Sequence, residues 1–143
     1  MRNSGPIIIV DDDMDDQFIL KEVLERLQVP NETKTFKSGI ELLVYLRDTE
    51  VQPFLILCDI NMPQMDGLEL RKEIDKDPEL KERSIPFIFF TTGASEAQIR
   101  MAYQLTVQGL FLKESSFEET ERTLKLIIDY WDRCRHPNIF WTK

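Results

Sequence analysis

The sequence predicts an α/β fold: a doubly wound, five-stranded parallel sheet with helices on both faces. One observation is that residues 7–10 and 54–58 are apolar without interruption, as in strands buried on both faces of a parallel sheet. Another is that strand-like and helix-like segments alternate along the chain, which is typical of βα units joined by right-handed crossovers. The alternation covers about residues 6–135, so we expect a single domain over residues 1–143 with a short tail at residues 136–143.

Five segments have the composition of strands, and apolar runs mark most of them. They lie at about residues 6–11, 32–37, 54–59, 86–91 and 109–113. The second of these segments is the most polar. We therefore expect it to be less buried than the other four.

Helices are expected after each strand, because apolar residues recur there at helical spacing. Three of them span about residues 15–27, 67–77 and 116–135, and two more open at Ser38 and Ser95. Serine followed three residues later by Glu or Gln predicts capping boxes at the helices that begin near residues 38, 95 and 116.

Apolar spacing also predicts which side chains of these helices face the core. In the first helix they are Phe18, Ile19, Val23, Leu24 and Leu27, and in the last helix they are Leu124, Ile127, Ile128 and Trp131. The acids at the start of the first helix are interpreted as charges that favour the helix dipole rather than as ligands, and these are Asp13, Asp15 and Asp16.

Composition excludes several classes of protein. The net charge is −8 with acids and bases mixed along the helices, which argues against binding to nucleic acid or to an anionic membrane surface. No apolar run approaches the roughly 20 residues of a membrane span. Cys58 and Cys134 lie far apart, which favours free thiols and a cytoplasmic location. His136 is the only histidine, so a metal site built from histidines is not expected.

Acidic residues gather where two of the predicted strands end. Asp11, Asp12 and Asp13 follow the first strand, and Asp59 ends the third. Ligand sites in parallel sheets form at the carboxyl ends of the strands. Carboxylates that converge there repel one another unless a cation or a proton joins them, and a site made only of oxygen suits Mg²⁺. The sequence therefore predicts an acidic, magnesium-binding pocket.

The other strand ends carry groups that can hold a phosphoryl group. Thr91 and Thr92 end the fourth strand, and Lys113 ends the fifth. A hydroxyl and an ammonium group can bind phosphoryl oxygens, and an aspartate can act as a nucleophile toward phosphorus. Neither GxGxxG nor GxxxxGK occurs, which favours a small phosphoryl group over a bound nucleotide.

In this arrangement the chain resembles the receiver domain of two-component response regulators. The resemblance is carried by Ile8-Ile9-Val10-Asp11-Asp12, by Cys58-Asp59-Ile60-Asn61-Met62-Pro63-Gln64-Met65-Asp66-Gly67, by Thr91 and by Lys113. These residues occur in the order and at the spacing of the family, over about residues 6–135. The resemblance implies a flavodoxin-like fold with the strand order 2-1-3-4-5. It also implies a stand-alone, CheY-like regulator, since the tail is too short for an output domain.

The resemblance also implies a role for each site residue. Asp59 would accept a phosphoryl group from a phosphohistidine on a sensor histidine kinase or a phosphotransfer protein. Asp12 would bind Mg²⁺ directly, Asp11 directly or through water, and Asp59 and the backbone carbonyl of Asn61 would complete the protein ligands. Two further residues, Thr91 and Lys113, would bind the phosphoryl group. The reaction is then a phosphoacceptance with slow self-dephosphorylation, and the protein is not otherwise an enzyme.

The expected readout is a change of conformation that modulates an unknown downstream protein. The resemblance places the output surface at about residues 95–128. Large apolar side chains near the end of the chain suggest a homodimer through the last helix and the tail, and these are Trp131, Ile139, Phe140 and Trp141.

Three positions depart from the family pattern. Glu114 follows Lys113 where proline is usual, and a cis peptide bond is not expected there because it costs about 3 kcal/mol without proline. Leu110 stands where an aromatic switch residue is common, with Phe111 beside it. Thr92 replaces a smaller residue. These changes concern the signalling readout rather than the phosphorylation.

Two other functions stay open at this point. One is a magnesium-dependent phosphohydrolase with an aspartyl nucleophile, which would release phosphate steadily. Its usual second acid is absent, because Asn61 stands two residues after Asp59 and cannot exchange protons as an acid does. The other is a binding module whose partner affinity ignores phosphorylation, which is favoured by the three departures from the family pattern.

Overall fold

The computed structural model describes residues 4–136. Its strands are β1 (Ile7–Val10), β2 (Thr33–Phe36), β3 (Leu55–Cys58), β4 (Phe87–Thr91) and β5 (Gly109–Leu112). Its helices are α1 (Met14–Arg26), α2 (Gly39–Asp48), α3 (Gly67–Lys76), α4 (Pro78–Arg83), α5 (Glu96–Gln104) and α6 (Phe117–Arg133). The strands are parallel in the order β2-β1-β3-β4-β5, which confirms the predicted fold class and strand order.

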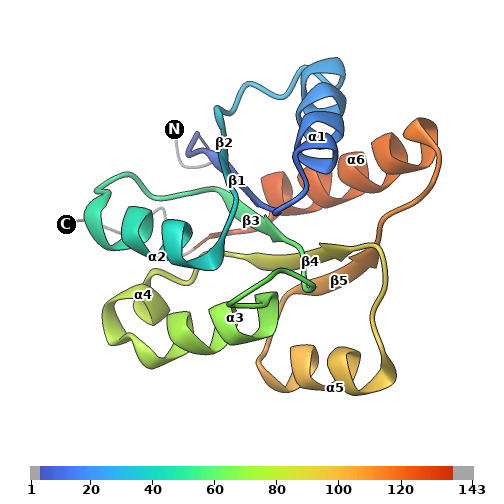
Figure 1. Ribbon diagram of the computed structural model, residues 1–143. Coiled ribbons are helices and arrows are strands. Elements are labelled where there is room, and N and C mark those ends of the chain that lie inside the picture. Colours follow the sequence, from blue (N-terminus) through green and yellow to red (C-terminus); the bar gives the residue numbers. More distant parts are fainter. Residues whose placement is uncertain (1–3, 137–143) are drawn as a thin grey trace.

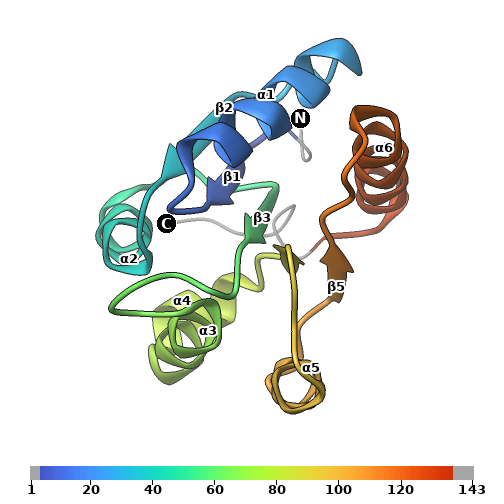
Figure 2. The same cartoon turned by 45° about the vertical axis from the view of Figure 1, so that its right-hand side comes forward.

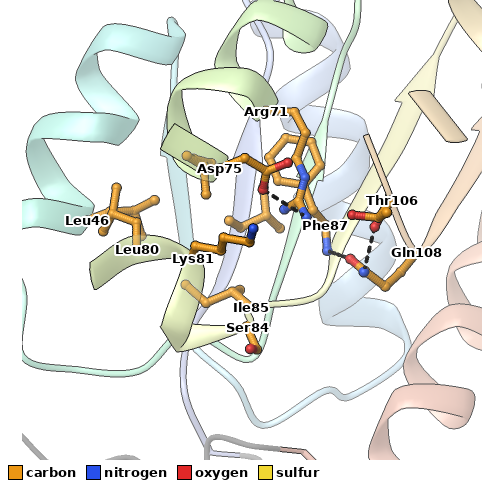
Figure 3. A pocket seen from close by; sticks show the side chains of 12 residues that line it. Leu46, Arg71, Asp75, Leu80, Lys81, Ser84, Ile85, Phe87, Thr106 and Gln108 are labelled. Atoms are coloured by element: carbon orange, nitrogen blue, oxygen red, sulfur yellow. Dashed lines mark hydrogen bonds and ion pairs between the residues drawn. The ribbon is translucent and has the colours of Figure 1, made fainter. Parts of the chain in front are cut away.

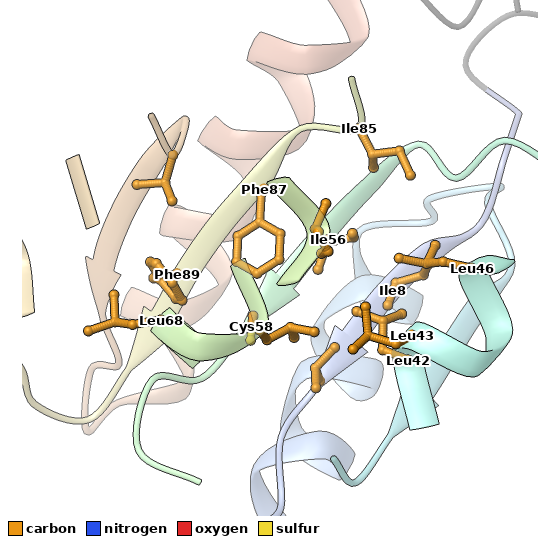
Figure 4. Close-up of a cluster of buried hydrophobic side chains, with 14 of the residues drawn as sticks. Ile8, Leu42, Leu43, Leu46, Ile56, Cys58, Leu68, Ile85, Phe87 and Phe89 are labelled. Carbon is orange, nitrogen blue, oxygen red and sulfur yellow. The ribbon is translucent and has the colours of Figure 1, made fainter. Parts of the chain in front are cut away.

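Helices cover both faces of the sheet (Figures 1 and 2). The helices α1 and α6 lie on one face, and α2, α3, α4 and α5 lie on the other. Alternate residues of β1 therefore enter different cores: Ile8 and Val10 pack beneath α2–α5 (Figure 4), and Ile7 and Ile9 pack beneath α1 and α6. Because both faces are buried, no polar residue interrupts this strand.

The register of the sheet positions the site. Val10 pairs with Phe36 on one side and with Cys58 on the other. The ladder continues past the strand ends, since the Asp11 N–H donates to the Phe36 carbonyl at 3.0 Å and the Asp59 N–H donates to the Val10 carbonyl at 2.9 Å. Asp11 and Asp59 therefore leave neighbouring strands at the same edge of the sheet.

The predicted core face of α1 is wrong at two positions. Phe18 and Ile19 are 64% and 40% exposed. Gln17 is buried instead, because its side-chain amide donates to the carbonyls of Asp11 at 2.6 Å and Phe36 at 3.2 Å. These two hydrogen bonds turn a polar residue of the first helical turn toward the sheet. The rest of the predicted face packs against the core as expected, namely Val23, Leu24 and Leu27.

The other predicted helix features are largely confirmed. The last helix packs Leu124, Ile127, Ile128 and Trp131 against the core, as expected. Serine is the N-cap of α2, α5 and α6, but only Ser95 with Gln98 forms the complete reciprocal box. At α2 and α6 the glutamate side chain makes a different contact.

The short helix α4 was not predicted. Pro78 ends the preceding helix as expected, but it also opens a new one, because proline suits the first position of a helix. Asp77 caps α4 by accepting from the N–H groups of Glu79 and Leu80. The helix then carries Arg83 into the interior of the protein.

Arg83 is 2% exposed and ties three segments together. Its guanidinium donates to the Leu46 carbonyl at 2.9 Å, to the Val51 carbonyl at 2.8 Å and to the Gln52 side chain at 3.0 Å. These bonds hold α4 against the end of α2 and the loop before β3. Burial lowers the pKa of Arg83 from its usual value.

The end of the described chain is anchored by aromatic packing. His136 is buried, with its ring 5.3 Å from that of Phe54 and 5.4 Å from that of Trp131. The remaining side chains of the suggested dimer surface lie outside the described residues, and these are Ile139, Phe140 and Trp141. Among the described helices, none combines the length and the apolar composition that crossing a bilayer requires.

Arg83→Met is expected to lower the free energy of unfolding by about 2–4 kcal/mol, because the carbonyls it satisfies lose their charged donor. Urea unfolding followed by circular dichroism measures this. Arg100→Met is the matched control, since Arg100 makes an exposed ion pair with Glu96 and should cost about 0.5 kcal/mol or less. Equal losses in the two variants would contradict the anchoring role of Arg83.

Candidate acidic site at the carboxyl edge of the sheet

Three carboxylates converge at the ends of β1 and β3. Asp11, Asp12 and Asp59 each place one oxygen within 4.8 Å of the others. Asp11 and Asp59 are 1% and 7% exposed, whereas Asp12 faces solvent. The structure thus brings together the three acids that the sequence placed at neighbouring strand ends, and it leaves one of them open to solvent.

Lys113 enters the same site from the end of β5. Its N–H donates to the Thr91 carbonyl at 2.7 Å, which continues the ladder between β4 and β5. Its Nζ lies 2.6 Å from Asp11 Oδ2, 2.9 Å from Asp16 Oδ2 and 3.8 Å from Asp59 Oδ2. The ammonium group therefore contacts three carboxylates, and Asp59 is the most distant of them.

Asp16 is a site residue that sequence reasoning missed. The sequence assigned it to the helix dipole, and Asp13 does cap α1 by accepting from the N–H groups of Asp15 and Asp16. A signal was nevertheless present, because a helix that follows β1 begins over the carboxyl edge of the sheet. Side chains of its first turn can therefore face the site.

The pKa values of Asp11 and Lys113 are both raised. The rise disfavours the charged form of Asp11 and favours the charged form of Lys113. Burial raises the pKa of Asp11 above its usual value, although the hydrogen bonds from Lys113 and from the Asp13 N–H oppose the rise. Burial also disfavours the charged form of Lys113, but its bonds to Asp11 and Asp16 outweigh this and raise the pKa of Lys113. Lys113 is therefore held as a cation among the acids.

Asn61 and Thr91 both reach the loop between β4 and α5. Asn61 Nδ2 donates to the Gly93 carbonyl at 3.0 Å, and Thr91 Oγ1 donates to the same carbonyl at 3.2 Å. Gln98 Nε2 of α5 donates to Asn61 Oδ1 at 3.1 Å. The side chain of Asn61 thus bonds to the loop before α5 and to α5 itself, and the role of its backbone carbonyl as a ligand stays a prediction.

Gly67 allows α3 to begin directly beside the site. A Cβ atom at this position would lie 2.3 Å from the Asp59 carbonyl oxygen and 2.7 Å from the Phe89 ring. No side chain fits at such distances, so the glycine of the motif has a steric cause. Asp66 caps α3 in a complete capping box with Glu69.

The positions that depart from the family pattern have definite surroundings. The described residues contain no cis peptide bond, as expected for Glu114. Leu110 is partly buried against the core beneath α2–α5, and Phe111 packs against the opposite core. Thr92 is exposed at the end of β4. In the register of the sheet Leu110 pairs with Phe89 and Leu112 pairs with Thr91, so the β5 residue beside Thr91 is also a leucine.

A separate cavity of about 220 Å³ lies near the amino ends of β4 and β5, opposite the carboxyl ends that carry the acids (Figure 3). Arg71 and Asp75 face it and form an ion pair at 3.3 Å, and the Arg71 guanidinium lies 5.4 Å from the centre of the Phe87 ring. Phe87 begins β4 and Gln108 precedes β5, so this cavity is separated from the acids by the length of the strands.

The donor set of the acidic site fits Mg²⁺. All of the candidate side-chain ligands are carboxylate oxygens, which hard divalent cations prefer. Ligands of Mg²⁺ lie at about 2.0–2.1 Å from the ion, so two of them are at most about 4.2 Å apart. The observed span of up to 4.8 Å requires only a small inward movement or a bridging water.

Comparison with known proteins defines the class to which this fold and site belong. The family model for the response regulator receiver domain matches residues 7–125. The chain therefore belongs to the receiver-domain family of two-component response regulators. It is 34% identical over 129 residues to the chemotaxis protein CheY-3 of Vibrio cholerae, covering 90% of this chain and 92% of that protein.

Solved structures of similar proteins agree with this membership. The phosphorylated cyanobacterial phytochrome response regulator RcpA is 30% identical, with a TM-score of 0.81 and coverage of 93% of this chain and 98% of that one. The Mn²⁺-bound form of response regulator Rcp1 is 27% identical, with a TM-score of 0.79 and coverage of 93% and 99%.

Mg²⁺ is expected to raise the midpoint of thermal unfolding of the wild-type protein, because a ligand of the folded state stabilises it by about 2.7 kcal/mol at a hundredfold excess over Kd. Asp12→Asn should lose most of this rise, since it removes the solvent-facing carboxylate of the acidic cluster without disturbing the core. Asp15→Asn, which makes the same change of charge on the exposed first turn of α1, should keep it. A rise of equal size in Asp12→Asn would contradict the assigned metal site.

Proposed function

We propose that the protein is a phosphorylation-controlled signalling switch in which Asp59 accepts a phosphoryl group. The donor would be a phosphohistidine on a sensor histidine kinase or a phosphotransfer protein. The observation that carries the proposal is the position of Asp59, whose carboxylate lies beside Asp11 and Asp12 and 3.8 Å from Lys113 Nζ. A nucleophile flanked by cation ligands and a lysine has the groups that phosphoryl transfer requires.

In the reaction, one carboxylate oxygen of Asp59 forms a bond to phosphorus while the bond between phosphorus and the histidine nitrogen breaks. The electron pair of the broken bond stays on the imidazole, which takes up a proton. Asp11, Asp12, Asp59 and the backbone carbonyl of Asn61 would hold Mg²⁺, which offsets negative charge on the phosphoryl oxygens when bound. Alignment and charge neutralisation then supply most of the acceleration.

Lys113 and Thr91 would receive the phosphoryl group. Lys113 is held as a cation, and its Nζ lies 3.8 Å from Asp59 Oδ2, although it is hydrogen-bonded to Asp11 and Asp16. Thr91 Oγ1 donates to the Gly93 carbonyl, so its hydroxyl has to turn from this loop to reach a phosphoryl oxygen. The turn would alter the loop that precedes α5. Phosphorylation shifts the equilibrium between two conformations only by the difference in its interactions with them.

The altered surface would contact the downstream protein. Residues 95–128 expose several large apolar side chains, namely Ile99, Tyr103, Leu112, Phe117 and Leu126. Of these, Ile99 and Tyr103 are one helical turn apart on α5, so they form one exposed apolar surface of that helix, and such a surface can be an interaction site. We keep the homodimer through α6 and the tail as a proposal, and an apolar hollow of about 490 Å³ beside β5 and α6 supports it. We also propose that the protein is cytoplasmic and that it does not bind nucleic acid.

The phosphorylation-independent binding module is the second candidate. Leu110 favours it, because this position lacks the aromatic side chain that commonly couples to Thr91 in the family. Steady release of phosphate would instead indicate a phosphohydrolase. Against that function, Asn61 stands where such an enzyme would have its second acid, and an amide cannot exchange protons as an acid does.

Wild-type protein treated with Mg²⁺ and acetyl phosphate is expected to gain the mass of one phosphoryl group, because Asp59 is the nucleophile of the site. Asp59→Asn should gain none, and chelation of Mg²⁺ should prevent the gain in the wild type. Intact mass spectrometry measures all three.

Asp15→Asn serves as the control for a general change of charge and should be phosphorylated like the wild type. An unchanged wild-type mass in the presence of Mg²⁺ would refute the proposal. If phosphorylation leaves the amide NMR signals of residues 95–128 unchanged, the result would favour the phosphorylation-independent binding module.

A further inference from the structure

One contact of the site has no part in the proposed reaction. Asp16 Oδ2 lies 2.9 Å from Lys113 Nζ, while Asp59 Oδ2 lies 3.8 Å from it. The first distance is that of a charge-assisted hydrogen bond, and the second is too long for one. Lys113 thus bonds to Asp11 and Asp16 in preference to the residue that would be phosphorylated.

We propose that Asp16 is a positioning residue that holds Lys113 toward α1 and thereby weakens the capture of a phosphoryl group on Asp59. This inference rests on the proposed function of Asp59. In a protein that is switched by phosphorylation of Asp59, Asp16 then sets how strongly the unphosphorylated state is preferred over the phosphorylated one.

The backbone of Asp16 is fixed, so its carboxylate acts from a defined point. Its N–H donates to Asp13 Oδ1 at 3.2 Å as part of the N-cap of α1. Gln17, the next residue, is buried and bonded to the carbonyls of Asp11 and Phe36. The start of α1 is therefore tied to the ends of β1 and β2, and Asp16 cannot simply follow Lys113 if that side chain moves.

The contact between Lys113 and Asp16 is partly buried, which strengthens their attraction. The side chain of Lys113 is 9% exposed, and that of Asp16 is 26% exposed. Water and salt screen such a pair less than they screen a surface ion pair. The attraction therefore competes with any new acceptor that appears on Asp59.

Asp16 also differs from the other two acids that face Lys113. The oxygens close enough together to share a cation belong to Asp11, Asp12 and Asp59. A cation in that group offsets the charge of Asp11 and Asp59 but makes no direct contact that would offset Asp16. Asp16 is then the carboxylate that keeps its full attraction for Lys113 when a phosphoryl group arrives.

Beryllofluoride with saturating Mg²⁺ tests the inference, because it binds an aspartate as a phosphoryl mimic and its affinity can be measured by amide NMR titration of the Gly93 and Lys113 signals. For Asp16→Asn we expect half-saturation at an about three- to tenfold lower concentration than for the wild type, as fits the loss of one partly buried charge pair. Asp15→Asn removes the same charge from the exposed face of the same turn and should behave like the wild type. Asp16→Glu restores a carboxylate and should return the affinity toward the wild-type value.

The thermal unfolding midpoint of each variant is measured beside the titration. Asp16→Asn should unfold at a slightly lower temperature while binding more tightly, a combination that a merely damaged site would not produce. Equal affinities for Asp16→Asn and Asp15→Asn, or weaker binding by Asp16→Asn, would overturn the inference alone. Absence of Asp59-dependent binding in the wild type would overturn the proposed function as well.

Discussion

Crowding of negative charge at the carboxyl edge of the sheet is the constraint on which the rest of the site depends. The register of β1 and β3 forces Asp11 and Asp59 to leave neighbouring strands side by side, and both are buried. Buried carboxylates are costly unless they are paired. In the free protein Lys113 pairs with these carboxylates; it follows β5 and lies about a hundred residues from Asp11 in sequence. A divalent cation between the three carboxylates would pair them more fully.

The same constraint explains which parts of the site were predictable. Apolar runs identified the strands, and the carboxyl ends of parallel strands must meet at one edge, so Asp11, Asp12, Asp59, Thr91 and Lys113 could be brought together from sequence. Asp16 and Gln17 could be placed only in the first turn of α1 above this edge, because which side chains of that turn face the sheet depends on how α1 is rotated. That rotation follows from two hydrogen bonds of Gln17, which no apolar pattern reveals, and it leaves Phe18 exposed. Arg83 was missed because a buried arginine is recognised only by the carbonyls that surround it.

The network around Gly93 gives a physical link between the site and α5. Its carbonyl accepts from Thr91 and Asn61, and Asn61 accepts from Gln98 in the first turn of α5. In the proposed switch, a change at either residue would reach the helix through these hydrogen bonds, without an aromatic side chain at position 110. The side chain of Leu110 already packs in the core beneath α2–α5, where it can respond to a shift of that helix.

A crystal structure of the protein with Mg²⁺ and beryllofluoride tests the central claim most directly. The account predicts the metal ion between Asp11, Asp12 and Asp59, beryllofluoride bonded to a carboxylate oxygen of Asp59, and Lys113 Nζ within hydrogen-bond distance of its fluorines. A metal ion bound away from these acids, or Lys113 directed away from an occupied Asp59, would contradict it.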